Sequence, residues 1–217
     1  MAKMPKEIYK SNFAKNRDIY ITELCKNKKV LHIGACDAPY TLEKHAKNRL
    51  LFKLIDEVAK EQLGIDIDKE GLEIMKNLGF NNIAHINMNN SYQIDFEPDI
   101  IIFGETIEHI MNLENALNSL KTTMSEDTRL VISTPNFITF TKIIVALSGK
   151  EFQHPDHNLL MTYKTLEQLI NKVGLTVEIK KFTFLTNHTE SLWGKADLLL
   201  ARFFPIFAST LLFVVKK

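Results

Sequence analysis

The sequence predicts an α/β fold built on a mostly parallel β-sheet with helices on both faces. Several strand candidates are short continuous apolar runs, such as DIIIF at residues 99–103. Runs of this kind are typical of strands that are buried on both faces, as they are in parallel sheets. The segments between them carry helical spacing, for instance Leu72, Met75 and Leu78, after which Gly79 ends the helix. The alternation of the two patterns predicts the fold class.

Taken in order, the strand candidates are bounded by turn residues or by helical segments. They are KVLHIG (29–34), QLGIDI (62–67), NIAHINM (82–88), DIIIF (99–103), RLVIST (129–134), TVEIKKFTF (176–184) and TLLFVVK (210–216). Residues 1–28 are expected to form a helical segment before the first strand, and residues 1–217 to form a single domain. Residues 137–163, an irregular stretch after RLVIST, are expected to contain a substrate lid, or alternatively a helix that packs on the sheet.

Composition restricts the function classes. The chain has 217 residues, and 27 basic against 26 acidic side chains give a net charge of +1. A broad basic field for a nucleic-acid backbone is therefore not expected, and nucleic acid is an unfavoured partner. Cys25 and Cys36 do not form a disulfide framework, and the lysine-rich N-terminus lacks the apolar core of a signal peptide, which favours the cytoplasm.

One apolar stretch near the end of the chain, residues 198–215, raises the question of membrane binding. Arg202 and Pro205 interrupt it, and an arginine at the bilayer centre costs about 2.5 to 3.5 kcal/mol. We therefore interpret it as part of the core and expect no transmembrane segment. Peripheral membrane contact through this stretch is the alternative.

The ends of the predicted strands carry residues suited to a nucleoside. Gly34 closes the first strand, followed by the small residues Ala35 and Cys36, and a glycine there lets the backbone approach a ligand. Asp66 ends the second strand, where a carboxylate can accept bonds from ribose hydroxyls, and Asn87 and Met88 end the third. Read separately, Gly34 could serve only the turn, Asp66 could cap a helix, and Met88 could be core.

A second group of polar residues follows the fourth strand in GETIEHI, residues 104–110. On a helix, Glu105, Glu108 and His109 would share one face. A later stretch, HPDH, adds His154, Asp156 and His157, and carboxylates with imidazoles suit Mg²⁺ or Mn²⁺. Alternatively, one of the three histidines acts as a simple base, or the glutamates only begin a helix.

These motifs together resemble the class I S-adenosylmethionine-dependent methyltransferases. The resemblance runs from about Val30 to the C-terminus and rests on VLHIGACDAPYT, LGIDID, DIIIFGETIEHI, STPN and LLFVVKK. It implies a Rossmann-like sheet of seven strands with the last antiparallel, and S-adenosylmethionine as cofactor. The implied cofactor-binding residues are Gly34, Ala35, Cys36, Asp66, Ile67, Asn87, Met88 and Glu105. His32, Cys36, Ala38 and Asn87 depart from the usual pattern.

The order ExxEH, STPN, HxxH is similar to that of two branches, the ubiquinone-pathway O-methyltransferases and the small-RNA 2′-O-methyltransferases. The RNA branch implies a divalent ion held by Glu105, Glu108, His109 and His157. The implied catalytic residues are Glu108, His109, His154 and His157. We expect methylation of a hydroxyl on a small molecule or on a sugar of a surface polysaccharide. The alternatives are RNA 2′-O-methylation and a non-catalytic nucleoside-binding or scaffold protein; the oligomeric state is not predicted.

Overall fold

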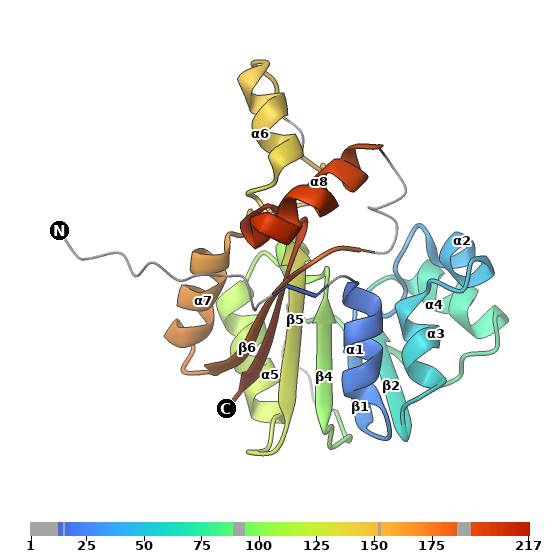
Figure 1. The fold of residues 1–217 in the computed structure, drawn as a ribbon. Coiled ribbons are helices and arrows are strands. Elements are labelled where there is room, and N and C mark those ends of the chain that lie inside the picture. The colour runs from blue at the N-terminus through green and yellow to red at the C-terminus, as the bar shows by residue number, and fades with distance from the viewer. Residues whose placement is uncertain (1–12, 15, 89–93, 152, 186–191) are drawn as a thin grey trace.

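The computed structural model describes residues 13–14, 16–88, 94–151, 153–185 and 192–217. Its centre is a sheet of seven strands (Figure 1). The strands are β1 (Lys29–Ile33), β2 (Glu61–Asp66), β3 (Ile83–His85), β4 (Ile100–Gly104), β5 (Arg129–Pro135), β6 (Thr176–Thr183) and β7 (Thr210–Lys216).

The strand order is β3-β2-β1-β4-β5-β7-β6, and the neighbours from β3 to β5 pair in parallel. The last strand, β7, is antiparallel to both β5 and β6. The prediction of a mostly parallel, seven-stranded sheet with an antiparallel last strand is confirmed. The order reverses direction between β1 and β4, and such a reversal leaves a crevice at the carboxyl ends of these strands.

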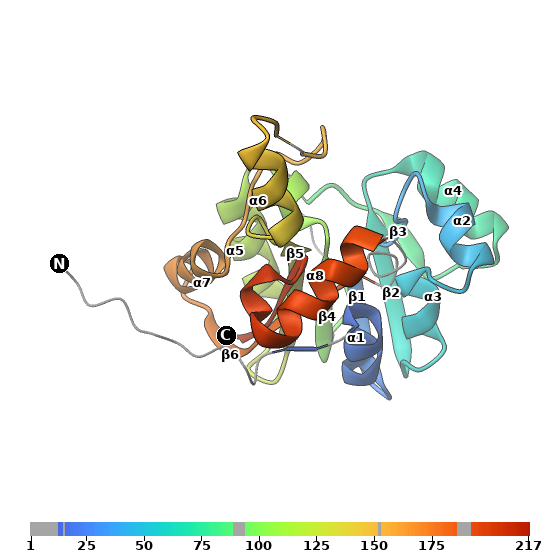
Figure 2. The ribbon, with the colours of Figure 1, turned by 45° about the horizontal axis from the view of Figure 1, so that its top comes forward.

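Helices cover both faces of the sheet (Figures 1 and 2). They are α1 (Arg17–Cys25), α2 (Thr41–Ala46), α3 (Leu51–Asp56), α4 (Lys69–Asn77), α5 (Leu113–Thr123), α6 (Phe140–Leu147), α7 (Tyr163–Lys172) and α8 (Leu192–Phe203), with short 3₁₀ helices η2 (Ile107–His109) and η4 (Pro205–Phe207).

The alternation of side chains along each strand divides the core. Ile101 and Phe103 of β4 pack with α5 and α7, whereas Ile100 and Ile102 pack with α1 and α3. Both sets are buried, which explains why β4 reads as an unbroken apolar run in the sequence.

Several segments differ from their predicted form. The third strand is shorter than residues 82–88, since regular pairing covers only Ile83–His85. The predicted helix starting at Glu105 does not form: Glu105 has a positive φ of 50°, and only Ile107–His109 coil, as a 3₁₀ helix. Of residues 1–28, the described helix is Arg17–Cys25, and residues 1–12 and 15 lie outside the described part.

The interpretation of residues 198–215 as core is right for β7 and wrong for the end of α8. Leu211 to Val215 are buried, but Leu199, Phe203 and Phe204 are more than half exposed, at 58%, 65% and 57%. No helix within the described ranges is long and apolar enough to cross a membrane.

Candidate active site

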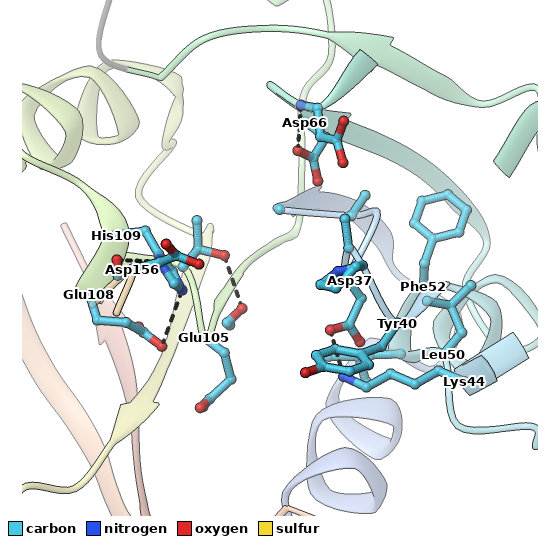
Figure 3. Close-up of a pocket in the computed structure, with 18 of the residues that line it drawn as sticks. Asp37, Tyr40, Lys44, Leu50, Phe52, Asp66, Glu105, Glu108, His109 and Asp156 are labelled. Atoms are coloured by element: carbon cyan, nitrogen blue, oxygen red, sulfur yellow. Dashed lines mark hydrogen bonds and ion pairs between the residues drawn. The ribbon is translucent and has the colours of Figure 1, made fainter. Parts of the chain in front are cut away.

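A cavity of about 520 Å³ opens at the carboxyl ends of β1 and β4, where the strand order reverses. A smaller cavity of about 60 Å³ adjoins it, and the two share Gly34, Asp66, Ile67 and Thr106 in their walls. Figure 3 shows the larger cavity, with Glu108 and His109 on one side, Tyr40 and Lys44 on the other, and Asp66 at one end. The two cavities form a continuous site across the crevice.

Gly34 makes the turn after β1 and has a left-handed φ of 72°. A Cβ at this position would lie 2.3 Å from the Thr106 hydroxyl oxygen, so the backbone can approach the segment after β4 only because the side chain is absent. The two strand ends that border the cavity therefore touch at Gly34.

Asp66, at the end of β2, is held by two backbone groups. Its Oδ2 accepts a hydrogen bond of 2.8 Å from the Cys36 amide, and its Oδ1 accepts one of 3.0 Å from the Asp68 amide. Each oxygen retains a further lone pair. The carboxylate is thus fixed at the junction of the two cavities with capacity to accept bonds from a ligand.

The side chains that line the smaller cavity are apolar apart from the Asn87 amide, the Asp66 carboxylate and the Thr106 hydroxyl. Its walls include Ile67, Ile86, Met88 and Ile110, with Asn87 as the amide. Mostly apolar walls with one amide suit a purine ring, because the amide oxygen can accept a hydrogen bond from the amino group of the purine.

Arg17 reaches the larger cavity from α1 and is buried, with an exposed fraction of 5%. Its Nη2 lies 2.6 Å from Asp18 Oδ1, and its Nη1 lies 3.3 Å from Glu105 Oε1. Burial alone would lower the pKa of Arg17, but Asp18 and Glu105 outweigh burial and raise it. The guanidinium is a fixed positive charge in the cavity wall.

Glu105 is turned toward Arg17 by its left-handed backbone, and its amide donates to the Ser133 carbonyl at 2.8 Å. Burial raises its pKa, although Arg17 opposes this shift. Its buried Oε1 forms the ion pair with Arg17 but accepts no hydrogen bond of good geometry. A buried carboxylate oxygen of this kind is suited to a cationic ligand group.

Glu108 is almost fully buried, at 1% exposure, in the wall of the same cavity. Its Oε2 accepts a hydrogen bond of 3.1 Å from the Thr134 hydroxyl of β5. Burial, reinforced by the Glu105 carboxylate, raises the pKa of Glu108 to about 8.

Two imidazoles face Glu108. Oε1 lies 4.0 Å from His109 Nε2 and 3.9 Å from His157 Nε2. His109 Nδ1 donates to the Asp156 carbonyl at 2.9 Å, because a carbonyl can only accept. Burial, together with His109 and His154, lowers the pKa of His157 to about 4. In neutral His109 the lone pair is therefore on Nε2, and neutral His157 has a lone pair on one of its two ring nitrogens.

Hydrogen bonds fasten the segment after α6 to η2. The Asn158 and Leu159 amides donate to the Glu108 carbonyl at 2.9 and 3.2 Å, and the Asn158 side chain donates to the His109 carbonyl at 3.1 Å. These bonds help to hold His154, Asp156 and His157 in the wall of the cavity. They explain how HPDH comes to lie beside GETIEHI, which is distant in sequence.

A family described as "Methyltransferase domain" matches residues 19–179. The chain belongs to this methyltransferase domain family. No curated protein matches it.

Solved structures of methyltransferases share the fold at low identity. A SAM-dependent methyltransferase from Archaeoglobus fulgidus is 17% identical over 92% of this chain and 90% of its own, with a TM-score of 0.56. One from Aquifex aeolicus is 15% identical over 91% and 86%, with a TM-score of 0.57. The small RNA methyltransferase HEN1 is 17% identical over 100% of this chain and 27% of its own, with a TM-score of 0.60.

The methyltransferase domain gathers most of the residues that the sequence singles out. Ligand atoms of Glu108, His109 and His157 lie within 4.8 Å of one another, while Glu105 is not in this group because it faces Arg17. His154 lies beside His157, with ring centroids 4.9 Å apart. Gly34, Ala35, Asp66 and Ile67 line the larger cavity, Asn87 and Met88 the smaller, and the Cys36 side chain lines neither.

Sequence reasoning missed several residues of the methyltransferase cavity. Asp37, Tyr40 and Lys44 form its far wall, where Lys44 Nζ lies 2.5 Å from Asp37 Oδ1. Their signal was their place in the GACDAPYT loop and the helix that follows. Arg17 had no local signal, since only the fold brings α1 to the end of β4.

Proposed function

We propose that the chain transfers a methyl group from S-adenosylmethionine to a hydroxyl oxygen of a small molecule or a surface-glycan sugar. The membership of the methyltransferase domain family supports methyl transfer. The choice of oxygen as acceptor rests on the histidines and Glu108, which suit removal of a hydroxyl proton.

The two cavities fit the cofactor part by part. The adenine would occupy the smaller cavity beside Asn87 and Met88, and the ribose hydroxyls would donate to Asp66 at the junction. The methionine part would pass over Gly34, where Arg17 can bind the carboxylate and Glu105 Oε1, which lies 3.3 Å from Arg17 Nη1, can also accept from the ammonium group.

One observation carries the acceptor chemistry: the hydrogen bond from His109 Nδ1 to the Asp156 carbonyl. It fixes the neutral tautomer in which Nε2 is unprotonated and faces the cavity. Nε2 can then take the proton of an acceptor hydroxyl as the oxygen attacks the methyl carbon. The carbon–sulfur bond breaks, the sulfur keeps the electron pair, and S-adenosylhomocysteine leaves.

The same atoms could hold a divalent cation, Mg²⁺ or Mn²⁺. Glu108, His109 and His157 would be its ligands, since their ligand atoms lie within 4.8 Å of one another. Such a cation lowers the pKa of a coordinated hydroxyl and orients vicinal hydroxyls. The raised pKa of Glu108, about 8, fits a carboxyl that a cation would help to ionise.

A terminal ribose of RNA is the second candidate acceptor. The structural likeness to HEN1 covers the whole of this chain and favours it, and a ribose end offers vicinal hydroxyls. The net charge of +1 argues against a long nucleic-acid substrate. A non-catalytic nucleoside-binding protein of this fold is the further alternative.

The cofactor part of the proposal is tested by calorimetric titration with S-adenosylhomocysteine, which needs no acceptor. We expect one site per chain with micromolar affinity. Absence of binding would favour the non-catalytic alternative. If S-adenosylhomocysteine binds, acceptors with vicinal hydroxyls, namely catechols, sugars and RNA ends, would be tested with labelled S-adenosylmethionine.

The cation is tested by titrating Mn²⁺ into the protein. We expect His157→Ala and Glu108→Gln to weaken Mn²⁺ binding by at least about tenfold, because the loss of a group that only supports a ligand already costs about 10- to 100-fold in affinity. His45→Ala, on α2 and outside the cation group, is the matched control. If Mn²⁺ does not bind and methylation continues in chelator, the histidines act as bases without a metal.

A further inference from the structure

The outer face of α8 carries large apolar side chains, whereas such a face of a helix on a folded domain is usually polar. Leu192, Leu199 and Phe203 are 83%, 58% and 65% exposed. At 3.6 residues per turn, their spacing places the three side chains within about 40° of one another. The inner face carries Gly194, Asp197 and Ala201, which are buried. Leu198 packs against the core, but three large apolar side chains of α8 point outward, opposite a face of small and polar residues. A helix that only covers a core would keep such side chains on its inner face.

The neighbouring helix α6 also exposes large apolar side chains. It has no buried residue, and Ile143, Ile144 and Leu147 are 40%, 39% and 80% exposed. The Thr141 hydroxyl donates to Asp197 at 2.8 Å, which joins α6 to the inner face of α8. The two helices lie side by side in both views, and Figure 1 shows them above the carboxyl ends of the strands (Figures 1 and 2). We call the five residues Ile143, Ile144, Leu147, Leu199 and Phe203 the α6–α8 surface.

The exposed charges around the α6–α8 surface are mostly positive. Lys195 and Arg202 are exposed and lie on the same flank of the apolar stripe of α8. Lys150 is exposed just after α6. Among described residues 137–151 and 192–204, the exposed acidic residue is Glu151, because Asp197 is buried. An apolar surface bordered by cations is complementary to an anionic lipid interface.

We propose that the α6–α8 surface docks the protein peripherally on a bilayer that contains anionic phospholipid. The exposed leucines, isoleucines and Phe203 would enter the boundary between headgroups and acyl chains, while Lys195 and Arg202 bind the lipid phosphates. The projecting shape of α6 suits insertion at this shallow depth (Figure 1).

A second copy of the chain fits this surface less well. A two-fold contact would place the same surface on both subunits, so two borders that are mostly cationic would be brought together. Like charges brought together in this way oppose association. The exposed acid near α6, Glu151, is outnumbered by the three cations.

The position of the surface relates it to the cavity without depending on the proposed reaction. β5 ends at Pro135, which lines the larger cavity, and α6 begins at Phe140. Docking would therefore place the bilayer on the carboxyl edge of the sheet, where the cavity opens. Lipid binding can be measured whether or not the chain methylates an acceptor.

The test is flotation of the full chain with vesicles of phosphatidylcholine and phosphatidylglycerol, and with vesicles of phosphatidylcholine alone. We expect binding to the mixed vesicles, weakened by high salt. Leu199→Glu with Phe203→Glu should reduce the partition coefficient by at least about tenfold, since two apolar side chains no longer enter the lipid. Ile19→Glu, at an equally exposed position on α1 (63%), should leave it unchanged.

Further variants separate the two parts of the surface. Lys195→Glu with Arg202→Glu should abolish the preference for phosphatidylglycerol, and Leu147→Glu should weaken binding through α6 alone. Circular dichroism and thermal melting would show that each variant is folded. Failure of the wild-type chain to float, or equal flotation of the Leu199/Phe203 variant, would overturn the proposal. The proposal would also be overturned if the wild-type chain did not bind vesicles but formed a dimer that Leu199→Glu dissociates.

Discussion

Asp66 serves two parts of the site at once, because it borders both cavities and accepts from two backbone amides. We expect Asp66→Ala to weaken binding of S-adenosylhomocysteine by about one to two orders of magnitude, the scale of lost charged hydrogen bonds. Isothermal titration measures this change. Asp56→Ala, on the exposed end of α3, is the matched control, and equal affinities for the two variants would remove Asp66 from the ribose site.

Glu105 and Glu108 show at the scale of single residues what the sequence predicts and what it does not. Their spacing with His109 identified the right stretch, but the inference that a helix presents all three together was wrong. Glu105 has a left-handed backbone and turns to the buried Arg17, a partner distant in sequence. Contacts between residues far apart in the sequence produce no periodic sequence pattern. The grouping of Glu108, His109 and His157 could therefore be identified only from the structure.

At the scale of elements, the turn between β1 and α2 depends on one glycine. Gly34→Ala would place a Cβ 2.3 Å from the Thr106 hydroxyl, in a backbone conformation with φ 72°. We expect a loss of about 2 to 4 kcal/mol of unfolding free energy, from left-handed strain and from crowding together. Denaturant unfolding measures it.

The chain offers a matched control for this turn. Gly149 has φ 75°, and a Cβ there meets nothing within 4 Å, so Gly149→Ala should cost only the strain, about 1 kcal/mol. Thr106→Ala combined with Gly34→Ala should recover part of the loss by removing the crowded atom. Equal losses for the two alanine variants would mean that contact with Thr106 does not matter.

The strands were more predictable than the helices near the site. Each predicted strand forms, and TLLFVVK matches β7 residue for residue, because apolar runs report burial directly. The length of the third strand was overestimated, since its half-exposed residues pair only with β2. The end of α8 was misjudged as core because apolar composition alone does not say which side of a helix faces the sheet.

For the whole molecule, the stability in acid should depend on one buried imidazole. His32 of β1 is 3% exposed, stacks on Phe52 at 5.8 Å between ring centroids, and has no hydrogen-bond partner at Nδ1. Burial, with a contribution from Arg17, lowers the pKa of His32 to about 3 from its usual 6.5. The unfolded chain therefore binds a proton at higher pH than the folded chain does.

The sign of the pH effect follows from this order of pKa values. The stability that neutral His32 provides is fully present above its unfolded pKa of 6.5 and is lost as pH falls toward the folded pKa of about 3. Between pH 7 and pH 4.5 this group should remove about 2 to 3 kcal/mol of unfolding free energy. His32→Asn cannot titrate, so its stability should fall less over the same interval in urea unfolding. His85→Asn, at an exposed position, should keep the wild-type dependence, and an unchanged dependence in His32→Asn would assign the acid sensitivity to other groups.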